Sequence, residues 1–208
     1  MLSESSNPMT SPSVDQQVSE ASNGLAKLKV ANAVVPRPLF SADLISPEVQ
    51  ALLPTHYIIR PLSEDDFAKG FFDCLAQLTV TGDVSLELFK ETFATMLDQK
   101  ANYVVVIEDK ERSAIVACGT LVQERKFIRN CGKIGHIEDI VVSSTERGKR
   151  LGMHMIHQLK HVAREIGCYK VILNCHEKNV EFYKKCGLVL KDVQMTEYFD
   201  QPTPKTNL

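Results

Sequence analysis

A short basic segment with two glycines offers the clearest chemistry in this sequence. Residues 147–152 are Arg-Gly-Lys-Arg-Leu-Gly, between the apolar run 137–142 and the helix-like run 151–166. The first amides of a helix have no partner within the helix, and the helix dipole adds partial positive charge at the same end. A strand, a glycine-bearing turn and a helix start together therefore predict an anion site.

The same segment is also compatible with a solvated basic turn or a short nucleic-acid patch. The whole chain has 24 Lys and Arg against 26 Asp and Glu, a net charge of −2. No global field therefore favours nucleic acid or an anionic membrane, and the basic character is local. We expect no nucleic-acid partner.

Three further side chains suit acid–base chemistry. Glu138 and Asp139 stand in an apolar strand, where carboxylates are costly unless they have partners. Strand neighbours point to opposite faces, so both face one pocket only if a bulge turns them. A structural ion pair with Lys170 or Arg125 is the alternative. Tyr183 is a candidate general acid or a packed core tyrosine.

Composition excludes several other classes of protein. None of the six cysteines forms a C-x-x-C pair, so we predict no metal site. The polar N-terminus has no signal pattern, and no apolar run is long enough to span a bilayer. We therefore expect a cytoplasmic chain with reduced thiols and no membrane span.

Proline separates the predicted domain from its flanks. Seven of the nine prolines lie at or before residue 61, and none lies between residues 62 and 201. Residues 1–54 are predicted to be a largely disordered or loosely docked tail, residues 55–200 the folded domain, and residues 201–208 a short tail. Residues 39–53 carry apolar side chains and form the part of that tail that could dock.

Hydrophobic spacing predicts an α+β domain with a mixed, mostly antiparallel central sheet flanked by helices. Ser63, Ser85 and Asn179 are the expected helix caps. Strands are predicted at 57–62, 103–107, 114–127, 136–142, 170–174 and 188–199, and helices at 63–78, 85–97, 151–166 and 179–186.

The turn resembles that of the GCN5-related N-acetyltransferase superfamily, whose fingerprint is Q/R-x-x-G-x-G/A. Arg150 replaces the middle glycine here, and we expect it to take an ordinary helical backbone. Within the superfamily, the segments GHIEDIVV (135–142), GCYKVIL (167–173) and EKNVEFYKKCG (177–187) resemble the glucosamine-6-phosphate N-acetyltransferase family. The resemblance covers roughly residues 57–195.

The resemblance implies direct acetyl transfer from acetyl-CoA to the 2-amino group of glucosamine 6-phosphate in a ternary complex. The products would be CoA and N-acetylglucosamine 6-phosphate, as in UDP-N-acetylglucosamine biosynthesis. It also implies a homodimer with substrate sites near the subunit interface, and no metal.

The resemblance further implies roles for particular residues. The catalytic group is Tyr183 as general acid, with Glu138, Asp139 and Asn174. The cofactor-binding group is Ile140, Val141, Val142, Arg147, Gly148, Lys149, Arg150, Leu151, Gly152, Met153, Lys178, Asn179, Val180 and Tyr183. The substrate-binding group is Thr79, Lys126, Arg129, Glu138, Asp139, Ile140, Tyr169, Lys170 and Asn174.

Two positions depart from the family pattern. Asn174 stands where an acidic residue is usual, and Tyr198 stands near an expected basic phosphate contact. Two alternatives therefore stay open: an acetyltransferase for a different small amine, and an inactive acyl-CoA-binding regulator. Asn179 is equally compatible with a cofactor contact and with a plain helix cap.

Overall fold

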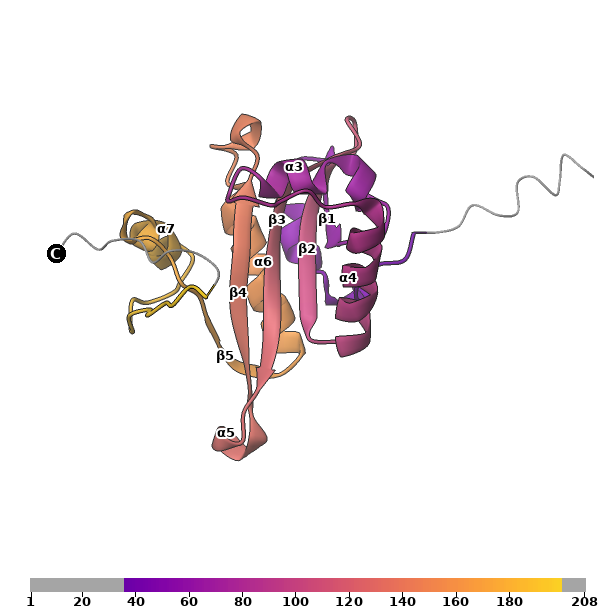
Figure 1. Ribbon diagram of the computed structural model, residues 1–208. Coiled ribbons are helices and arrows are strands. Elements are labelled where there is room, and N and C mark those ends of the chain that lie inside the picture. The colour runs from indigo at the N-terminus through magenta and orange to yellow at the C-terminus, as the bar shows by residue number, and fades with distance from the viewer. Residues whose placement is uncertain (1–35, 200–208) are drawn as a thin grey trace, which may run out of the picture. The chain divides into compact units, whose positions relative to one another are not determined.

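The computed structural model describes residues 36–199 (Figure 1). The chain divides into two units, Met1–Pro36 and Arg37–Leu208, and the elements below belong to the second. The predictions for residues 1–35 and 200–208 lie outside the described residues.

A five-stranded sheet in the order β1-β2-β3-β4-β5 forms the centre of the unit. Neighbouring strands are antiparallel except β4 and β5, which are parallel. The strands are β1 (Tyr57–Pro61), β2 (Asn102–Asp109), β3 (Ala114–Arg125), β4 (Lys133–Val142) and β5 (Cys168–Ile172). The predicted mixed, mostly antiparallel sheet is confirmed.

Helices cover both faces of this sheet (Figure 1). The α-helices are α2 (Pro47–Ala51), α3 (Phe71–Leu75), α4 (Leu86–Gln99), α5 (Ile128–Cys131), α6 (Leu151–Glu165) and α7 (Val180–Lys185). The 3-10 helices are η1 (Ala42–Leu44), η2 (Asp66–Lys69), η3 (Ser144–Glu146) and η4 (Glu177–Asn179).

Alternation along the strands builds two cores. In β2, Val105 and Ile107 pack with α6 and α2 on one face, while Val104 and Val106 pack with α3 and α4 on the other. This is the expected result for a strand buried on both faces, since successive side chains point to opposite sides. Each fully buried aliphatic side chain contributes roughly 1.5–3 kcal/mol relative to exposure.

The two long helices follow their sequence signals closely. Ser85 caps α4, because its hydroxyl accepts a hydrogen bond from the amide of Leu88 at 3.2 Å. In α6, Leu151, Met155 and Leu159 recur at helical spacing, and all three are buried. This burial fixes α6 against the sheet and so fixes where its N-terminus lies.

The folded structure begins earlier than the predicted boundary at residue 55. Leu39, Val49 and Leu53 are buried in the cores. The side chain of Gln158 in α6 accepts a hydrogen bond from the amide of Ser46 at 2.9 Å. It also donates a hydrogen bond to the carbonyl of Leu44 in η1 at 2.8 Å. The apolar pattern of residues 39–53 had marked this segment as one that could dock, but its contacts with distant α6 depend on the tertiary structure.

Two predicted elements differ in the structure. The strand expected at 188–199 is wrong, because these residues carry no assigned strand and Val193, Met195 and Phe199 are largely exposed. Apolar content alone cannot supply the partner edge that a strand needs. The helix expected at 63–78 is divided into η2 and α3 by Gly70, whose φ of 76° lies outside the helical region.

Candidate active site

The segment between β4 and α6 forms a tight turn with two left-handed residues. Gly148 has φ 83° and Arg150 has φ 61°. The prediction of an ordinary helical backbone at Arg150 is therefore wrong. The chain must reverse direction between the strand and the helix, and Arg150 takes the left-handed conformation at the N-cap. A non-glycine residue pays a strain cost there, and such strain is found often at functional sites.

The turn leaves a group of backbone donors free. Within residues 36–199, no carbonyl accepts a hydrogen bond from the amides of residues 147–152. The amide of Met153 differs, since it donates to the carbonyl of Arg150 at 3.0 Å. We therefore limit the anion-binding amides to residues 147–152, at the positive end of α6.

The basic side chains of this turn are not equivalent. Lys149 donates to the Glu146 carboxylate at 2.5 Å and to the Tyr57 hydroxyl at 3.0 Å. Arg147 and Arg150 are exposed, and neither forms an ion pair with any described residue. Of the basic side chains in this turn, those of Arg147 and Arg150 therefore keep their charge unpaired within residues 36–199.

A bulge interrupts β4 beside this turn. Glu138 pairs with Thr120 and Val141 pairs with Cys118, so Asp139 and Ile140 together oppose one residue of β3. Asp139 has φ 54°, in the left-handed region. Such a bulge changes the directions of neighbouring side chains.

The opposite edge of β4 is open beyond its first residues. The parallel pairing with β5 ends at His136 and Ile172, so residues 137–142 have no strand partner on that edge within the described part of the chain. Figure 1 shows β5 and α7 diverging from the upper half of β4. Ile140, Val141 and Val142 thus belong to a strand segment whose outer edge is available to a ligand.

Neither carboxylate at the bulge forms an ion pair with another described residue. No ion pair joins Glu138 or Asp139 to Lys170, Arg125 or any other described residue, so the structural ion-pair interpretation is wrong. Burial raises the pKa of Glu138, and the nearby charge of Asp139 raises it further. A carboxyl with a raised pKa is better suited to exchange protons near neutral pH.

Tyr183 lies on α7 and is half-buried. Burial raises the pKa of its phenol, with smaller contributions from Cys175, Cys186 and Glu138. Its hydroxyl has no hydrogen bond to any described residue. The neighbouring Phe182 ring stands 3.5 Å from where a Cβ on Gly152 would be. This contact places α7 against the start of α6.

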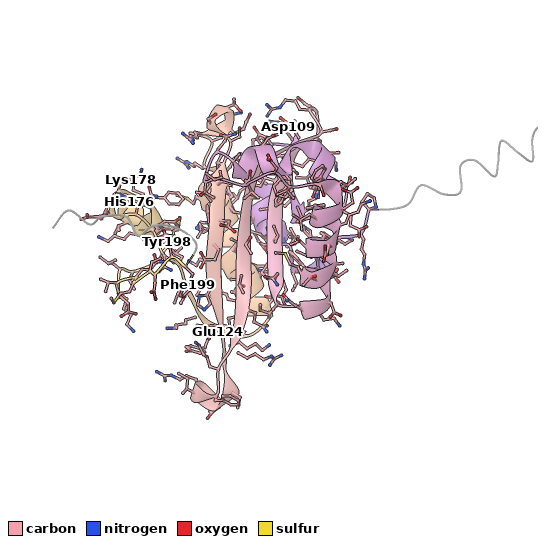
Figure 2. The ribbon with its side chains drawn as sticks, viewed as in Figure 1. Asp109, Glu124, His176, Lys178, Tyr198 and Phe199 are labelled. Atoms are coloured by element: carbon pink, nitrogen blue, oxygen red, sulfur yellow. The ribbon has the colours of Figure 1, made fainter. Side chains whose placement is uncertain are left out.

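The segment before α7 differs from the predicted cap. The side chain of Asn179 makes no capping hydrogen bond, so its interpretation as a plain side-chain cap is wrong. At the start of η4, the Nδ1 atom of His176 instead accepts a hydrogen bond from the amide of Lys178 at 3.2 Å. Figure 2 shows His176 and Lys178 beside α7. Asn174 is exposed after β5, and Val180 opens α7.

The predicted sugar-phosphate residues lie toward the other end of β4. Lys126 forms an ion pair with Glu124, which Figure 2 shows far along β3 toward α5. Arg129 is exposed in α5, in a left-handed backbone. Tyr169 and Lys170 are exposed on β5.

Within one chain these basic residues do not join the turn. Lys170 pairs with Ile134, which precedes Glu138 by four residues, or about 13 Å along a strand. The turn lies beyond the far end of the same strand. Tyr183 lies within range of the charge of Glu138, and its neighbour Phe182 packs near Gly152 at the start of α6, whereas Lys126 and Arg129 lie toward the hairpin tip between β3 and β4.

Two polar contacts near the turn were not predicted. The side-chain oxygen of Gln77 accepts a hydrogen bond from the amide of Ser144 at 2.7 Å. Gln77 follows α3 and lies two residues before the exposed Thr79, so this bond joins the segment after α3 to the loop before the turn. Glu146 is buried and hydrogen-bonded, although it directly precedes a basic run. The position of one acidic residue beside three basic residues was the sequence signal that could have indicated an ion pair here.

A bulged strand with an open outer edge is thus followed by a turn of free amides at the start of a helix. The profile of the acetyltransferase (GNAT) family matches residues 67–188, more than half of the chain. The chain belongs to this family.

Curated relatives and a solved structure give closer comparisons. The chain is 50% identical to glucosamine 6-phosphate N-acetyltransferase 1 of Dictyostelium discoideum over 70% of this chain and 91% of the relative. It is 47% identical to an Arabidopsis thaliana glucosamine 6-phosphate N-acetyltransferase over 68% of this chain and 96% of the relative. The crystal structure of glucosamine-6-phosphate N-acetyltransferase from Arabidopsis thaliana matches with a TM-score of 0.68 and 46% identity, covering 69% and 99% of the two chains.

In residues 36–199 no helix has the length and apolar character to cross a membrane. No group of three or more His, Cys, Asp or Glu side chains in this same range is arranged to hold a metal ion.

Proposed function

We propose that this chain transfers the acetyl group of acetyl-CoA to the 2-amino group of glucosamine 6-phosphate, giving N-acetylglucosamine 6-phosphate and CoA. The row of unpaired amides at residues 147–152, beside the open edge of β4, carries the proposal. The similarity to glucosamine 6-phosphate N-acetyltransferases supports the choice of acceptor.

The turn and β4 would bind the coenzyme. The free amides of residues 147–152 suit a diphosphate, and the exposed side chains of Arg147 and Arg150 add charge beside them. The open edge from Ile140 to Val142 supplies backbone donors and acceptors for an amide-containing arm such as pantetheine. Lys178 and Asn179 of η4 and Val180 of α7 are proposed as further coenzyme contacts.

Tyr183 is the proposed general acid. Since burial raises the pKa of its phenol, Tyr183 stays protonated at neutral pH and can donate its proton to the departing thiolate. The attacking amine loses a proton, and Glu138, whose pKa is also raised, would accept it directly or through water. Asp139 would help to orient the ammonium or amine group through its charge.

The acceptor site is proposed to need a second copy of the chain. Lys126, Arg129, Tyr169 and Lys170 lie away from the turn of their own chain, and Thr79 is exposed after α3. Large apolar side chains in residues 188–199 and at the tip of the β3–β4 hairpin are exposed, including Phe127 at 98%. Exposed large apolar side chains of this kind are often covered in a protein–protein interface. We therefore propose a homodimer in which basic residues of one subunit approach the phosphate of a sugar held by the other.

The two departures from the family pattern fit this arrangement. Asn174 is exposed after β5 and offers a side-chain oxygen and a main-chain carbonyl to the amine, without acting as a base. Tyr198 cannot neutralise a phosphate, so affinity for the phosphate would rest on the lysines and Arg129. A cytoplasmic location stays a prediction from the sequence.

A thiol-release assay tests the proposal. Purified protein is mixed with acetyl-CoA and glucosamine 6-phosphate, with unphosphorylated glucosamine as the matched control. We expect fast release of CoA with the phosphorylated sugar and much slower release with glucosamine. No release with either sugar would contradict the proposed reaction, and equal rates would contradict the phosphate site.

Two alternatives predict other outcomes of the same assay. An enzyme for another small amine would release thiol only with that amine. An inactive regulator would bind coenzyme A in calorimetry and release no thiol with any acceptor.

A further inference from the structure

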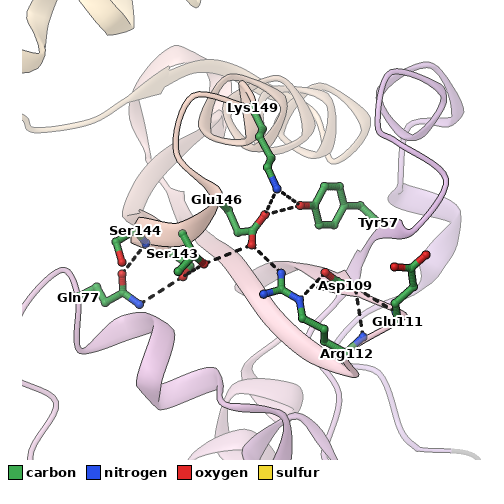
Figure 3. A network of polar contacts seen from close by, with 10 residues as sticks. Tyr57, Gln77, Asp109, Glu111, Arg112, Ser143, Ser144, Glu146 and Lys149 are labelled. Atoms are coloured by element: carbon green, nitrogen blue, oxygen red, sulfur yellow. Dashed lines mark hydrogen bonds and ion pairs between the residues drawn. The ribbon is translucent and has the colours of Figure 1, made fainter.

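Glu146 is a buried carboxylate at the entrance of the coenzyme turn. It ends η3, its side chain is 3% exposed, and it directly precedes Arg147. Its two carboxylate oxygens accept hydrogen bonds from the Lys149 ammonium at 2.5 Å, from the Arg112 guanidinium at 2.6 Å and from the Tyr57 hydroxyl (Figure 3). A buried carboxylate with this many charged and neutral donors is fully satisfied and held in one orientation.

The partners of Glu146 come from separate parts of the sheet. Tyr57 begins β1 and is almost completely buried. Arg112 belongs to the β2–β3 connection and is itself held by Asp109 at 2.7 Å. Glu146 therefore connects the start of the turn to β1 and to the β2–β3 hairpin, as the dashed contacts in Figure 3 show.

The turn itself has little else to hold it. Residues 147–150 are exposed, and their amides have no acceptor among the described residues. Lys149 is the exception among their side chains, because it reaches back to Glu146 and lies 5.6 Å from the centre of the Tyr57 ring. The ion pair between Glu146 and Lys149 thus holds the turn against the start of β1.

We infer that Glu146 is a positioning residue that preorganises the free amides of the turn for the diphosphate of the coenzyme. Amides that are already aligned bind without paying the entropy of ordering the backbone, whereas a loosened turn pays this cost on binding. Glu146 also engages the Lys149 ammonium, so the remaining positive charge at the anion site comes from Arg147 and Arg150. This inference rests on the proposed function, because it assumes that the anion is the coenzyme diphosphate.

The test compares two acetyl donors in the Glu146→Gln variant. Acetyl-CoA carries the diphosphate, whereas S-acetylpantetheine has the same thioester arm without it. We expect the KM for acetyl-CoA to rise roughly ten- to a hundredfold with little change in kcat, because several turn residues must then be ordered on binding. Activity with S-acetylpantetheine should stay within about twofold of the wild-type protein.

Glu87→Gln is the matched control, since Glu87 is an exposed glutamate in the first turn of α4. It should leave both donors unaffected. An equal loss with both donors in Glu146→Gln would assign Glu146 to general stability, and an unchanged KM for acetyl-CoA would also overturn the inference. If the wild-type protein itself fails to bind coenzyme A, the proposed function fails instead.

A second variant keeps the test decisive if Glu146→Gln does not fold. Arg112→Met removes one donor to Glu146 from a half-exposed side chain outside the turn. We expect a rise of about threefold in the KM for acetyl-CoA, with S-acetylpantetheine unchanged, because one of several contacts is lost. Equal kinetics of Arg112→Met and wild-type protein with both donors would then contradict the inference.

Discussion

The charge on Glu146 should make a measurable, pH-dependent contribution to folding. Hydrogen bonds from Lys149, Tyr57 and Arg112 lower the pKa of this carboxyl from an ordinary value of 4.5 to about 2. A carboxyl whose pKa is depressed in the folded chain stabilises it above the unfolded pKa and loses this effect as the pH falls through the folded pKa. The relevant window therefore runs from about pH 4.5 down to about pH 2.

The size of the contribution follows from the same values. A difference between 4.5 and about 2 corresponds to about 3 kcal/mol at neutral pH. The side chains of Arg112 and Lys149 are 49% and 47% exposed, so solvent screens their interaction with the carboxylate. We therefore expect Glu146→Gln to lower the free energy of unfolding by about 2 kcal/mol at pH 7.5, and by less than half of that at pH 3.

Urea unfolding followed by circular dichroism measures this difference at a fixed protein concentration. Glu181→Gln is the matched control, since Glu181 also pairs with a lysine three residues later but is 75% exposed. It should leave the unfolding free energy essentially unchanged at either pH, because solvent screens an exposed ion pair. Two results would refute the reasoning: equal stability of Glu146→Gln and wild-type protein at pH 7.5, or a deficit of the same size at pH 3.

Three further predictions concern catalysis, packing and assembly. Tyr183→Phe should lower kcat by roughly ten- to a thousandfold in the thiol-release assay, and an unchanged kcat would assign Tyr183 to packing. Because burial raises the pKa of the phenol, any fall of wild-type kcat caused by loss of its proton should lie above the ordinary tyrosine pKa of 10.0. Gly135→Ala should cost about 1–3 kcal/mol in urea unfolding, since its Cβ would stand 2.6 Å from Leu121 in the core, and unaltered stability would contradict this packing. Sedimentation at micromolar concentration should give a dimer that Phe127→Ser weakens, and a wild-type monomer would exclude the proposed subunit interface.

Local sequence patterns were sufficient where one element supplies its own signal. Leu151, Met155 and Leu159 recur at helical spacing, and burial of that stripe needs only some apolar face to pack against. Ser85 caps α4 through a hydrogen bond within four residues of sequence. Such short-range contacts are encoded by neighbours in the chain, so the sequence predicted them.

Backbone conformation at the site depended on geometry that the sequence does not display. Arg150 was expected to be helical, but the reversal from β4 to α6 holds it at φ 61°. The bulge at Asp139 arises from how β4 and β3 align, and the open edge of β4 from where β5 diverges. Register and divergence are properties of paired strands, and one strand alone cannot specify them.

The sequence by itself determined the chemistry available at residues 147–152, the α+β class and the family resemblance, because residue types and periodicities are local properties. Only the tertiary structure decided that η1 and α2 dock on α6, that residues 188–199 lack a strand partner within the described chain, and that Glu146 is buried. Burial and charge pairing depend on which distant segments meet. Glu146 illustrates the difference, since its partners Tyr57 and Arg112 lie 89 and 34 residues away in the chain.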